Sequence, residues 1–354
     1  MVGPGKSQSE GRMQEQLGRK VSSQRAWKRV DLDASTRWNV LLSNKAIEQL
    51  EVSAAGLPKD RLDWLNISKQ ELTGSELISR LDDVAEEINS GYGFAKIGGL
   101  DISKYSEDMI YRIYWIVALC LGEVVPQNAK GEMIGAVTDL IGGAARGTDD
   151  RGYTSSDELR FHCDGGGVSA LFCVRQAPLG GENAVVSLLS IYNEILAHHP
   201  QHLDTLHRGF PLYQRKEQGD GREKGSVSSS NFPTFSEDHG VISAWLNLKL
   251  AELASEVSDN PYSGAESEAL RVVETIAERD DFKFSLKLVP GEVLIVNNFA
   301  LMHKRSAFHD DPDPDRRRLM LRLWLNLHAA EQRSPAIAPL TSGFQHATPV
   351  IHAN

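Results

Sequence analysis

Two stretches in the first third of the chain repeat apolar residues at helical spacing. In the first stretch, residues 73–89, the apolar positions are Leu77, Ile78, Leu81, Val84 and Ile88. This spacing puts them on one face of an amphipathic helix, and a Thr or Ser is available to cap its start. Residues 106–121 predict a second, largely buried helix, and residues 94–97 between the two helices predict a short strand.

After residue 160 the pattern changes to short apolar runs separated by turn residues, which is typical of strands. The predicted strands are residues 169–174, 183–189, 241–245, 284–289, 292–297 and 318–327. Two long insertions interrupt them: residues 214–240 are rich in Gly, Ser and charge, and residues 246–279 are helical in pattern. Many strands with long excursions, preceded by helices, indicate a mainly β fold with helical decoration, a barrel or jelly roll. An alternating βαβ pattern is absent.

The domain organisation follows from the same pattern. Residues 1–30 lack apolar periodicity and are rich in Gly, Ser, Gln, Lys and Arg, so we expect a disordered tail. Residues 31–328 contain all the predicted elements and are interpreted as a single jelly-roll domain. Residues 329–354 are interpreted as a C-terminal extension.

Composition narrows the class of protein. Of the 354 residues, 41% are hydrophobic and 24% are charged, as in ordinary globular proteins. The net charge of −10 argues against a protein held to nucleic acid by phosphate contacts. The three cysteines form no C-x-x-C pair, which fits a reducing compartment. No apolar run approaches the ~20 residues of a membrane span, and no secretory signal is visible, so we expect a cytoplasmic protein.

The segment Leu159-Arg160-Phe161-His162-Cys163-Asp164 is followed by three glycines. In extended backbone His162 and Asp164 project to the same side. Together they supply one imidazole and one carboxylate, two of the three ligands in the 2-His-1-carboxylate facial triad that binds Fe(II). The glycines allow the backbone to turn sharply beside the metal. H-x-D alone is a weak signal, because it often occurs by chance.

A second segment, residues 290–305, combines a turn, an apolar strand and then His303, which could supply the third ligand from a distant point in the sequence. The last predicted strand alternates cleanly, with leucines on one face and Arg318, Met320, Arg322 and Trp324 on the other. Two arginines on one buried face are costly unless each meets an anion. A carboxylate is the natural partner, because the guanidinium fork matches its geometry.

The order H-x-D, G-G-E, N-N-x-x-x-x-H and R-x-x-x-R resembles the taurine dioxygenase-like, or clavaminate synthase-like, family of Fe(II)/2-oxoglutarate-dependent oxygenases. The resemblance covers residues 91–328 and implies a double-stranded β-helix (jelly roll, cupin-like) core. It implies that His162, Asp164 and His303 bind the iron and that Arg318 pairs with the distal carboxylate of 2-oxoglutarate. By the same likeness Arg322 lies beside the co-substrate or holds an anionic group of the substrate.

The sequence departs from the family pattern in two places near the site. Asn183 follows G-G-E where the family often has Thr or Ser, and its amide could donate to the co-substrate. Cys163 stands where Thr is common, and we expect its thiol near the iron without being a ligand. Gln127 and Asn128 follow a strand-like run and are candidates for substrate contact, with a plain polar loop as the alternative.

Other histidines are weaker candidates for ligands. His309 lies in an Asp- and Pro-rich loop and His328 ends the last strand, so both are expected to face solvent. The group His198, His199, His202 and His207 is interrupted by Pro200, and its spacing does not keep to one helical face. We interpret it as surface histidines around a helix.

The function that the resemblance implies is an oxygenase that consumes O2 and 2-oxoglutarate, releases succinate and CO2, and oxidises an unactivated C–H bond. Hydroxylation, desaturation and oxidative cyclisation remain open. Arg322 and the absence of a membrane anchor favour a small polar substrate derived from a carboxylate or amino acid. Neither nucleic acid nor membrane is expected as a partner, and homo-oligomerisation is left open. The alternatives are a zinc hydrolase with the same three ligands, for which no general base is evident, and a non-catalytic jelly-roll binding protein.

Overall fold

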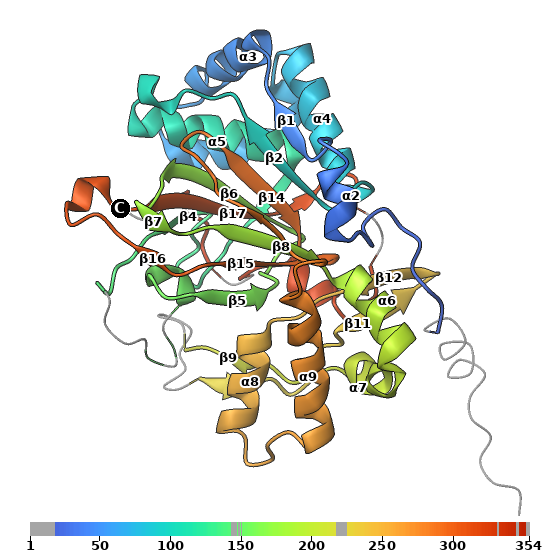
Figure 1. The fold of residues 1–354 in the computed structure, drawn as a ribbon. Helices are drawn as coiled ribbons and strands as arrows, with labels where there is room; N and C mark the ends of the chain where they lie inside the picture. The colour runs from blue at the N-terminus through green and yellow to red at the C-terminus, as the bar shows by residue number, and fades with distance from the viewer. Residues whose placement is uncertain are drawn as a thin grey trace, which may run out of the picture.

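The computed structural model describes residues 18–142, 147, 149, 151–216, 225–330, 333–344 and 347–351. In this part of the chain two β-sheets pack face to face and helices cover their outer surfaces (Figure 1). Apolar side chains from both sheets, among them Phe161, Val185 and Met320, are buried in one cluster between them. The predicted mainly β architecture with helical decoration is therefore confirmed.

The larger sheet has seven strands in the order β1-β2-β14-β6-β17-β3, with β4 also paired to β17. Their bounds are Asn39–Leu41 (β1), Phe94–Gly98 (β2), Gly122–Val125 (β3), Ile134–Val137 (β4), Val168–Arg175 (β6), Val293–Asn297 (β14) and Leu319–Leu327 (β17). Apart from the parallel pair β1 and β2, neighbouring strands are antiparallel. On β17 the predicted alternation holds: Leu321, Leu323 and Leu325 pack under the helices, while Met320 faces the other sheet.

The smaller sheet runs β13-β8-β15-β5 and carries the predicted ligands. Its strands are Leu159–His162 (β5), Asn183–Ser187 (β8), Phe284–Leu286 (β13) and Leu301–Arg305 (β15). β8 is shorter than the predicted strand 183–189, because the Ser187 hydroxyl accepts a hydrogen bond from the Ser190 amide (3.0 Å) and so caps a helix. Three further two-stranded ribbons are Leu179–Gly180 (β7) with Phe308–His309 (β16), Tyr213–Gln214 (β9) with Ser226–Val227 (β10), and Phe235–Asp238 (β11) with Val241–Ala244 (β12).

Three helices cover the outer face of the larger sheet (Figure 1). They are Asn44–Ala55 (α3), Ser75–Asn89 (α4) and Glu107–Leu121 (α5). The two predicted helices are thus confirmed. The Ser106 hydroxyl caps α5, but α4 begins after Gly74, which has no side chain to cap it. Its start is held instead by the Gln49 side chain, which accepts from the Leu77 amide (2.9 Å).

The remaining helices lie on the side of the smaller sheet (Figure 1). They are Leu188–His198 (α6), Leu203–Arg208 (α7), Leu248–Val257 (α8) and Gly264–Ala277 (α9). The helical insertion predicted at residues 246–279 is therefore a pair of helices, α8 and α9. None of the described helices is long and apolar enough to cross a bilayer.

Parts of the two segments outside the predicted domain, residues 1–30 and 329–354, pack on the domain. Residues 1–17 of the expected disordered tail lie outside the described residues, and residues 18–30 are largely exposed except around Trp27, which packs on the domain. Trp27 is 2% exposed, and its indole N–H donates to the Tyr92 carbonyl (2.7 Å). At the other end Ile337 and Ile351 are buried, and the Val350 carbonyl accepts from the Met133 amide (2.8 Å). The C-terminal extension therefore packs on the domain rather than projecting from it.

Candidate metal centre and adjoining cavities

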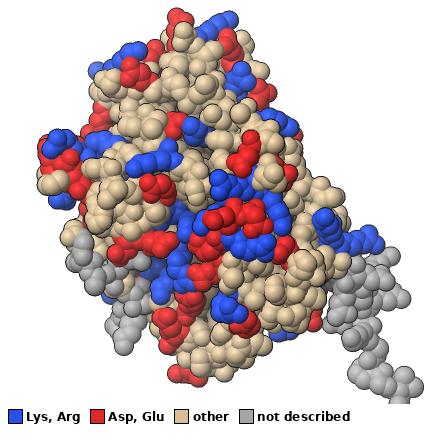
Figure 2. All heavy atoms as spheres, viewed as in Figure 1, with Lys and Arg blue, Asp and Glu red and all other residues tan. Residues whose placement is uncertain are grey.

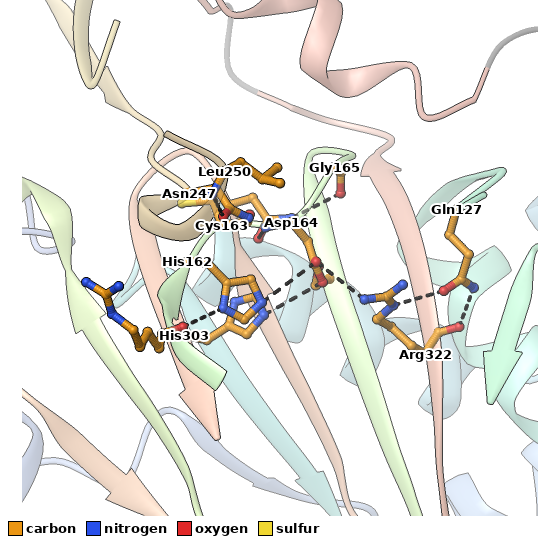
Figure 3. A network of polar contacts seen from close by, with 12 residues as sticks. Gln127, His162, Cys163, Asp164, Gly165, Asn247, Leu250, His303 and Arg322 are labelled. Carbon is orange, nitrogen blue, oxygen red and sulfur yellow. Dashed lines mark hydrogen bonds and ion pairs between the residues drawn. The ribbon is translucent and has the colours of Figure 1, made fainter. Parts of the chain in front are cut away.

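Strands β5 and β15 bring the two predicted histidine ligands together. They pair antiparallel with His303 opposite His162, and the two ring centroids are 4.4 Å apart. Asp164 follows β5 directly; its carboxylate oxygens lie 3.9 Å from His162 Nε2 and 3.7 Å from His303 Nε2 (Figure 3). One donor atom from each residue lies within 4.8 Å of the other two. Among the described residues this is the one group of three His, Cys, Asp or Glu side chains that fits a metal ion.

Hydrogen bonds hold Asp164 in place before any ligand binds. The Ser169 hydroxyl donates to Asp164 Oδ2 (3.0 Å), and the Asn298 amide nitrogen donates to that hydroxyl oxygen (3.1 Å). Asn298 also accepts from the Asp164 main-chain amide (3.3 Å). A carboxylate held by such outer partners keeps its orientation toward a metal. Asn298 belongs to the N-N-x-x-x-x-H motif, but no sequence pattern singled out Ser169.

Arg322 completes the surroundings of Asp164. Its Nη1 lies 3.4 Å from Asp164 Oδ1, while its Nε donates to Gln127 Oε1 (2.9 Å) (Figure 3). Gln127 in turn donates to the main-chain carbonyls of Met133 and Arg322 (3.1 and 2.8 Å). Gln127 therefore orients Arg322. Neither Gln127 nor Asn128 lines the cavities described below, so their predicted contact with substrate stays a prediction.

The charge states of Asp164 and His303 and the ring orientation of His162 suit metal binding. Burial alone would raise the pKa of Asp164, but the Arg322 guanidinium and the two imidazoles lower it well below its usual range. Burial, reinforced by His162, lowers the pKa of His303 to about 3, so this imidazole is neutral. His162 Nδ1 lies 2.8 Å from the Arg160 carbonyl. Because a carbonyl only accepts, Nδ1 carries the proton and Nε2 keeps its lone pair for a metal.

The glycines after Asp164 are required by Trp324. A Cβ on Gly165 would lie 2.8 Å from the Trp324 ring, and Gly166 has a φ of +76°, a conformation that glycine adopts without strain. The turn that follows the ligand is therefore packed against the indole. Cys163 points away from the site: its thiol donates to the Leu301 carbonyl (3.3 Å), and burial raises its pKa above the usual range.

One cavity runs from the three ligands to Arg318. It is lined by Asp164, Leu171, Asn183, His303, Arg318 and Arg322, among others. Arg318 is fully buried, and neither Nη1 nor Nη2 has a hydrogen-bond partner in the described part of the chain. The Asn183 Oδ1 atom is buried without a partner as well. Burial lowers the pKa of Arg318 to about 10, so the guanidinium remains charged at neutral pH. A buried guanidinium whose two Nη atoms have no partner favours an anionic ligand in this cavity.

A second cavity opens on the other side of the ligands. Its walls include His162, Asp164 and Trp324 and, across from them, Asn247, Lys249 and Leu250 at the start of α8. We call these last three residues the α8 wall. Tyr153, which the sequence did not single out, lines both cavities and lies over the Arg322 guanidinium at 4.6 Å. The histidines that were expected to be spectators, His309 and His328, are exposed.

Comparisons with known proteins agree with this geometry. The profile of the family described as "Taurine catabolism dioxygenase TauD, TfdA family" matches residues 57–324. The FR-33289 synthase of Streptomyces rubellomurinus is 24% identical over 343 residues, which cover 96% of this chain and 100% of that protein.

Two solved structures share the fold. The asparagine oxygenase in complex with Fe(II), 2S,3S-3-hydroxyasparagine and succinate superimposes with a TM-score of 0.62 at 17% identity, over 81% of this chain and 93% of that one. The non-heme iron oxygenase OrfP in complex with Fe and alpha-ketoglutaric acid gives a TM-score of 0.58 at 12% identity over the same shares, 81% and 93%. These likenesses confirm the predicted double-stranded β-helix core.

Proposed function

The chain belongs to the TauD/TfdA dioxygenase family and is an Fe(II)- and 2-oxoglutarate-dependent oxygenase, and we propose that His162, Asp164 and His303 hold its iron. The support is the close grouping of the three donor atoms, with the carboxylate ionised and the His303 imidazole neutral. Two histidines and one carboxylate are the ligand set of the facial triad, which leaves coordination positions open for co-substrate and O2.

We further propose that Arg318 binds the distal carboxylate of 2-oxoglutarate. The single observation that carries this assignment is the fully buried guanidinium whose two Nη atoms have no partner in the described structure. A carboxylate satisfies both atoms at once through a fork-to-fork pair. Asn183, in the same cavity, is the candidate for a second polar contact with the co-substrate.

Bound Fe(II) with 2-oxoglutarate and O2 supplies the oxidising power for a C–H bond, with succinate and CO2 as the co-products. The protein's own contribution is to position the reactants and exclude water. Ser169 and Arg322 fix the Asp164 carboxylate, and the Arg160 carbonyl fixes the His162 ring. The α8 wall and Tyr153 enclose the space beside the metal in which a substrate can lie.

We propose that the substrate is a small polar metabolite derived from a carboxylate or an amino acid. The solved relatives bind 3-hydroxyasparagine and L-Arg, and the second cavity adjoins the ligands directly. Arg322 lines this cavity and keeps one nitrogen, Nη2, without a partner in the described structure, so it is the candidate for contact with a substrate anion. A substrate screen scored by mass distinguishes hydroxylation, which adds one oxygen atom, from desaturation or cyclisation, which remove two hydrogens.

The reaction class is tested by incubating the purified protein with Fe(II), O2 and 2-oxoglutarate and measuring succinate. We expect succinate release that depends on iron and disappears in His162→Ala. Succinate formation that is equal with and without iron would overturn the proposal. Hydrolase activity with Zn(II) in place of iron would support the alternative of a zinc hydrolase. The absence of both activities would support the alternative of a non-catalytic binding protein.

We propose that the enzyme is cytoplasmic. All three cysteines are free and buried, which suits the reducing cytoplasm. A small molecule is the proposed partner, with no role for nucleic acid or membrane. Homo-oligomerisation remains open, and light scattering of the purified protein decides it.

A further inference from the structure

The Arg160 side chain, on β5, forms hydrogen bonds with both helices of the α8–α9 insertion. It lies two positions before His162, so the two side chains project from the same face of the strand. Its Nη1 and Nη2 donate to the two carboxylate oxygens of Glu252 on α8 (2.6 and 2.9 Å). Its Nε donates to Glu274 on α9 (2.6 Å). One guanidinium therefore connects a ligand-bearing strand to two helices far away in sequence.

The contact between Arg160 and the two glutamates has more hydrogen bonds and is less exposed than an ordinary surface ion pair. The pair with Glu252 is bidentate, and Glu274 lies within 2.5 Å of Nη2 as well as bonding Nε. The three side chains are 35%, 34% and 31% exposed, so solvent screens them only in part. Bidentate, partly shielded networks hold geometry better than isolated exposed pairs, which contribute little.

The main chain of the same residue touches the metal centre. The Arg160 carbonyl accepts the Nδ1 proton of His162 (2.8 Å). Any shift of β5 at this residue therefore rotates the imidazole or breaks the bond that fixes its tautomer. Arg160 thus contacts the insertion with its side chain and the predicted iron ligand with its carbonyl.

The insertion that Arg160 holds also forms a wall of the second cavity. The Leu246 carbonyl accepts from the Cys163 amide (2.8 Å), and the Asn247 side chain donates to the Cys163 carbonyl (3.3 Å) (Figure 3). These bonds fix the start of α8 directly over the ligands. Glu252 lies five positions after Asn247, so Arg160 provides the second attachment point of the same helix.

We propose that Arg160 is a positioning residue that couples the α8–α9 insertion to the iron ligand His162. The insertion and the metal then stabilise each other: an ordered insertion favours the ligating orientation of His162, and bound metal favours the ordered insertion. Such coupling is reciprocal by thermodynamic necessity. The inference rests on the proposed role of His162 as an iron ligand, and it adds a contact between that ligand and the insertion that forms the α8 wall.

The first test measures metal affinity in variants that leave every ligand intact. Glu252→Gln and Glu274→Gln remove a carboxylate charge in the insertion, and Arg160→Gln removes the guanidinium. We expect each variant to weaken Fe(II) binding under anaerobic conditions, and Arg160→Gln by about fivefold or more, the lower end of typical coupling between sites. Arg160→Lys keeps the charge but loses the fork, so it should restore part of the affinity.

Arg279→Gln is the matched control. Arg279 follows α9 and also pairs with two acidic residues, Glu194 at 2.6 Å and Asp281 at 2.8 Å, but it does not contact β5. Figure 2 shows acidic and basic side chains intermixed on the face where the end of α9 meets the smaller sheet. Arg160→Gln and Arg279→Gln both remove a charged pair, so a difference between them does not come from the loss of a charge alone. The control should leave the Fe(II) dissociation constant unchanged.

The second test uses hydrogen exchange to measure the effect of bound Fe(II) on the α8–α9 insertion. In the wild-type protein, Fe(II) alone should slow amide exchange in residues 252–257 and 270–277, and in Arg160→Gln this protection should be lost. Equal protection in both proteins, or unchanged Fe(II) affinity in Glu252→Gln and Glu274→Gln, would overturn the inference. A wild-type protein that binds no Fe(II) would instead overturn the proposed function, so the two failures are distinguishable.

Discussion

Arg318 lies directly before β17 and Arg322 lies within it; both are buried and line the same cavity, yet their surroundings differ. Arg322 has Gln127 and Asp164 as polar partners, and its guanidinium lies over the Tyr153 ring at 4.6 Å. Arg318 has one long side-chain hydrogen bond, to Gln176 at 3.3 Å, and no partner in the described structure for either Nη. Arg322 has a carboxylate partner within the protein and leaves only Nη2 without one, whereas both Nη atoms of Arg318 are without a partner and can bind a ligand.

The difference shows how a fold can separate holding a metal from holding a co-substrate. A buried charge is tolerated when it is paired and hydrogen-bonded, and it is costly when it is not. The unpaired charge of Arg318 destabilises the protein when no anion is bound, and a bound anion removes this destabilisation. At Arg322 the partner is Asp164, so this arginine already contributes to the metal centre. The predictions below test the comparison from its largest expected effect to its smallest.

The largest effect is expected from His303→Ala, which removes one of the three predicted ligands in the cavity that both arginines line. Because His303 supplies one of three donor atoms, the variant should lose stoichiometric Fe(II) binding and all succinate formation while remaining folded. Calorimetric titration with Fe(II) and circular dichroism measure the two properties. His309→Ala, at an exposed histidine six positions later, is the control and should behave as wild type; the reverse result would show that the ligand assignment is wrong.

Arg318→Ala should weaken 2-oxoglutarate binding by at least about 30-fold. Truncating one partner of a buried charge pair typically costs about 2–5 kcal/mol, and each 1.4 kcal/mol is tenfold in affinity. The measurement is the dissociation constant of 2-oxoglutarate with iron present and oxygen absent. Arg316→Ala, at an exposed position of the preceding turn, is the control. An unchanged constant in Arg318→Ala would remove the basis of the comparison.

Methionine at the two positions should change stability in opposite directions. Without ligands, Arg318→Met removes a buried charge whose Nη atoms have no partner, and this should stabilise the apoprotein by about 1–4 kcal/mol. Arg322→Met leaves Asp164 without its cation and should destabilise it by about 1–3 kcal/mol. Urea denaturation in the presence of a chelator measures both. Changes of the same sign would mean that the two sites are alike.

The smallest effect is expected from Gln127→Ala. This change leaves the Arg322 Nε and two main-chain carbonyls without their partner, at a cost of about 1–2 kcal/mol in the free energy of unfolding. The 2-oxoglutarate dissociation constant should stay unchanged, because Gln127 does not line the Arg318 cavity. A large loss of 2-oxoglutarate affinity would show that the surroundings of Arg322 and of Arg318 are not independent.

The sequence predicted the elements that depend on periodicity and the residues that belong to spaced motifs. Helices α4 and α5 and the alternation on β17 were accessible from periodicity, which is a local signal. The grouping of His162, Asp164 and His303 was implied by the family resemblance, which four motifs in the same order support.

The outer contacts of the site could not be predicted, because they depend on tertiary pairing. Ser169 reaches Asp164 only because the chain turns back at the three glycines, and Arg160 reaches Glu252 and Glu274 across more than 90 positions. No periodicity marks such residues. The tail boundary was wrong for the same reason: Val21, Ala26 and Trp27 form no periodic pattern, and the Trp27 indole N–H donates to a main-chain carbonyl 65 positions away.

The pairing of β5 with β15 also sets the order of events during synthesis. His162 and His303 are 141 positions apart (303 minus 162) and become neighbours only through this pairing. On the ribosome, therefore, the emerging chain has no metal site until β15 has left the exit tunnel and docked. β6 lacks both of its neighbours until β14 has emerged, and it lacks β17 until still later; unpaired strand edges of this kind promote aggregation. The three predicted ligands therefore come together only in a nearly complete chain, and the half-made barrel before that point exposes an unpaired strand.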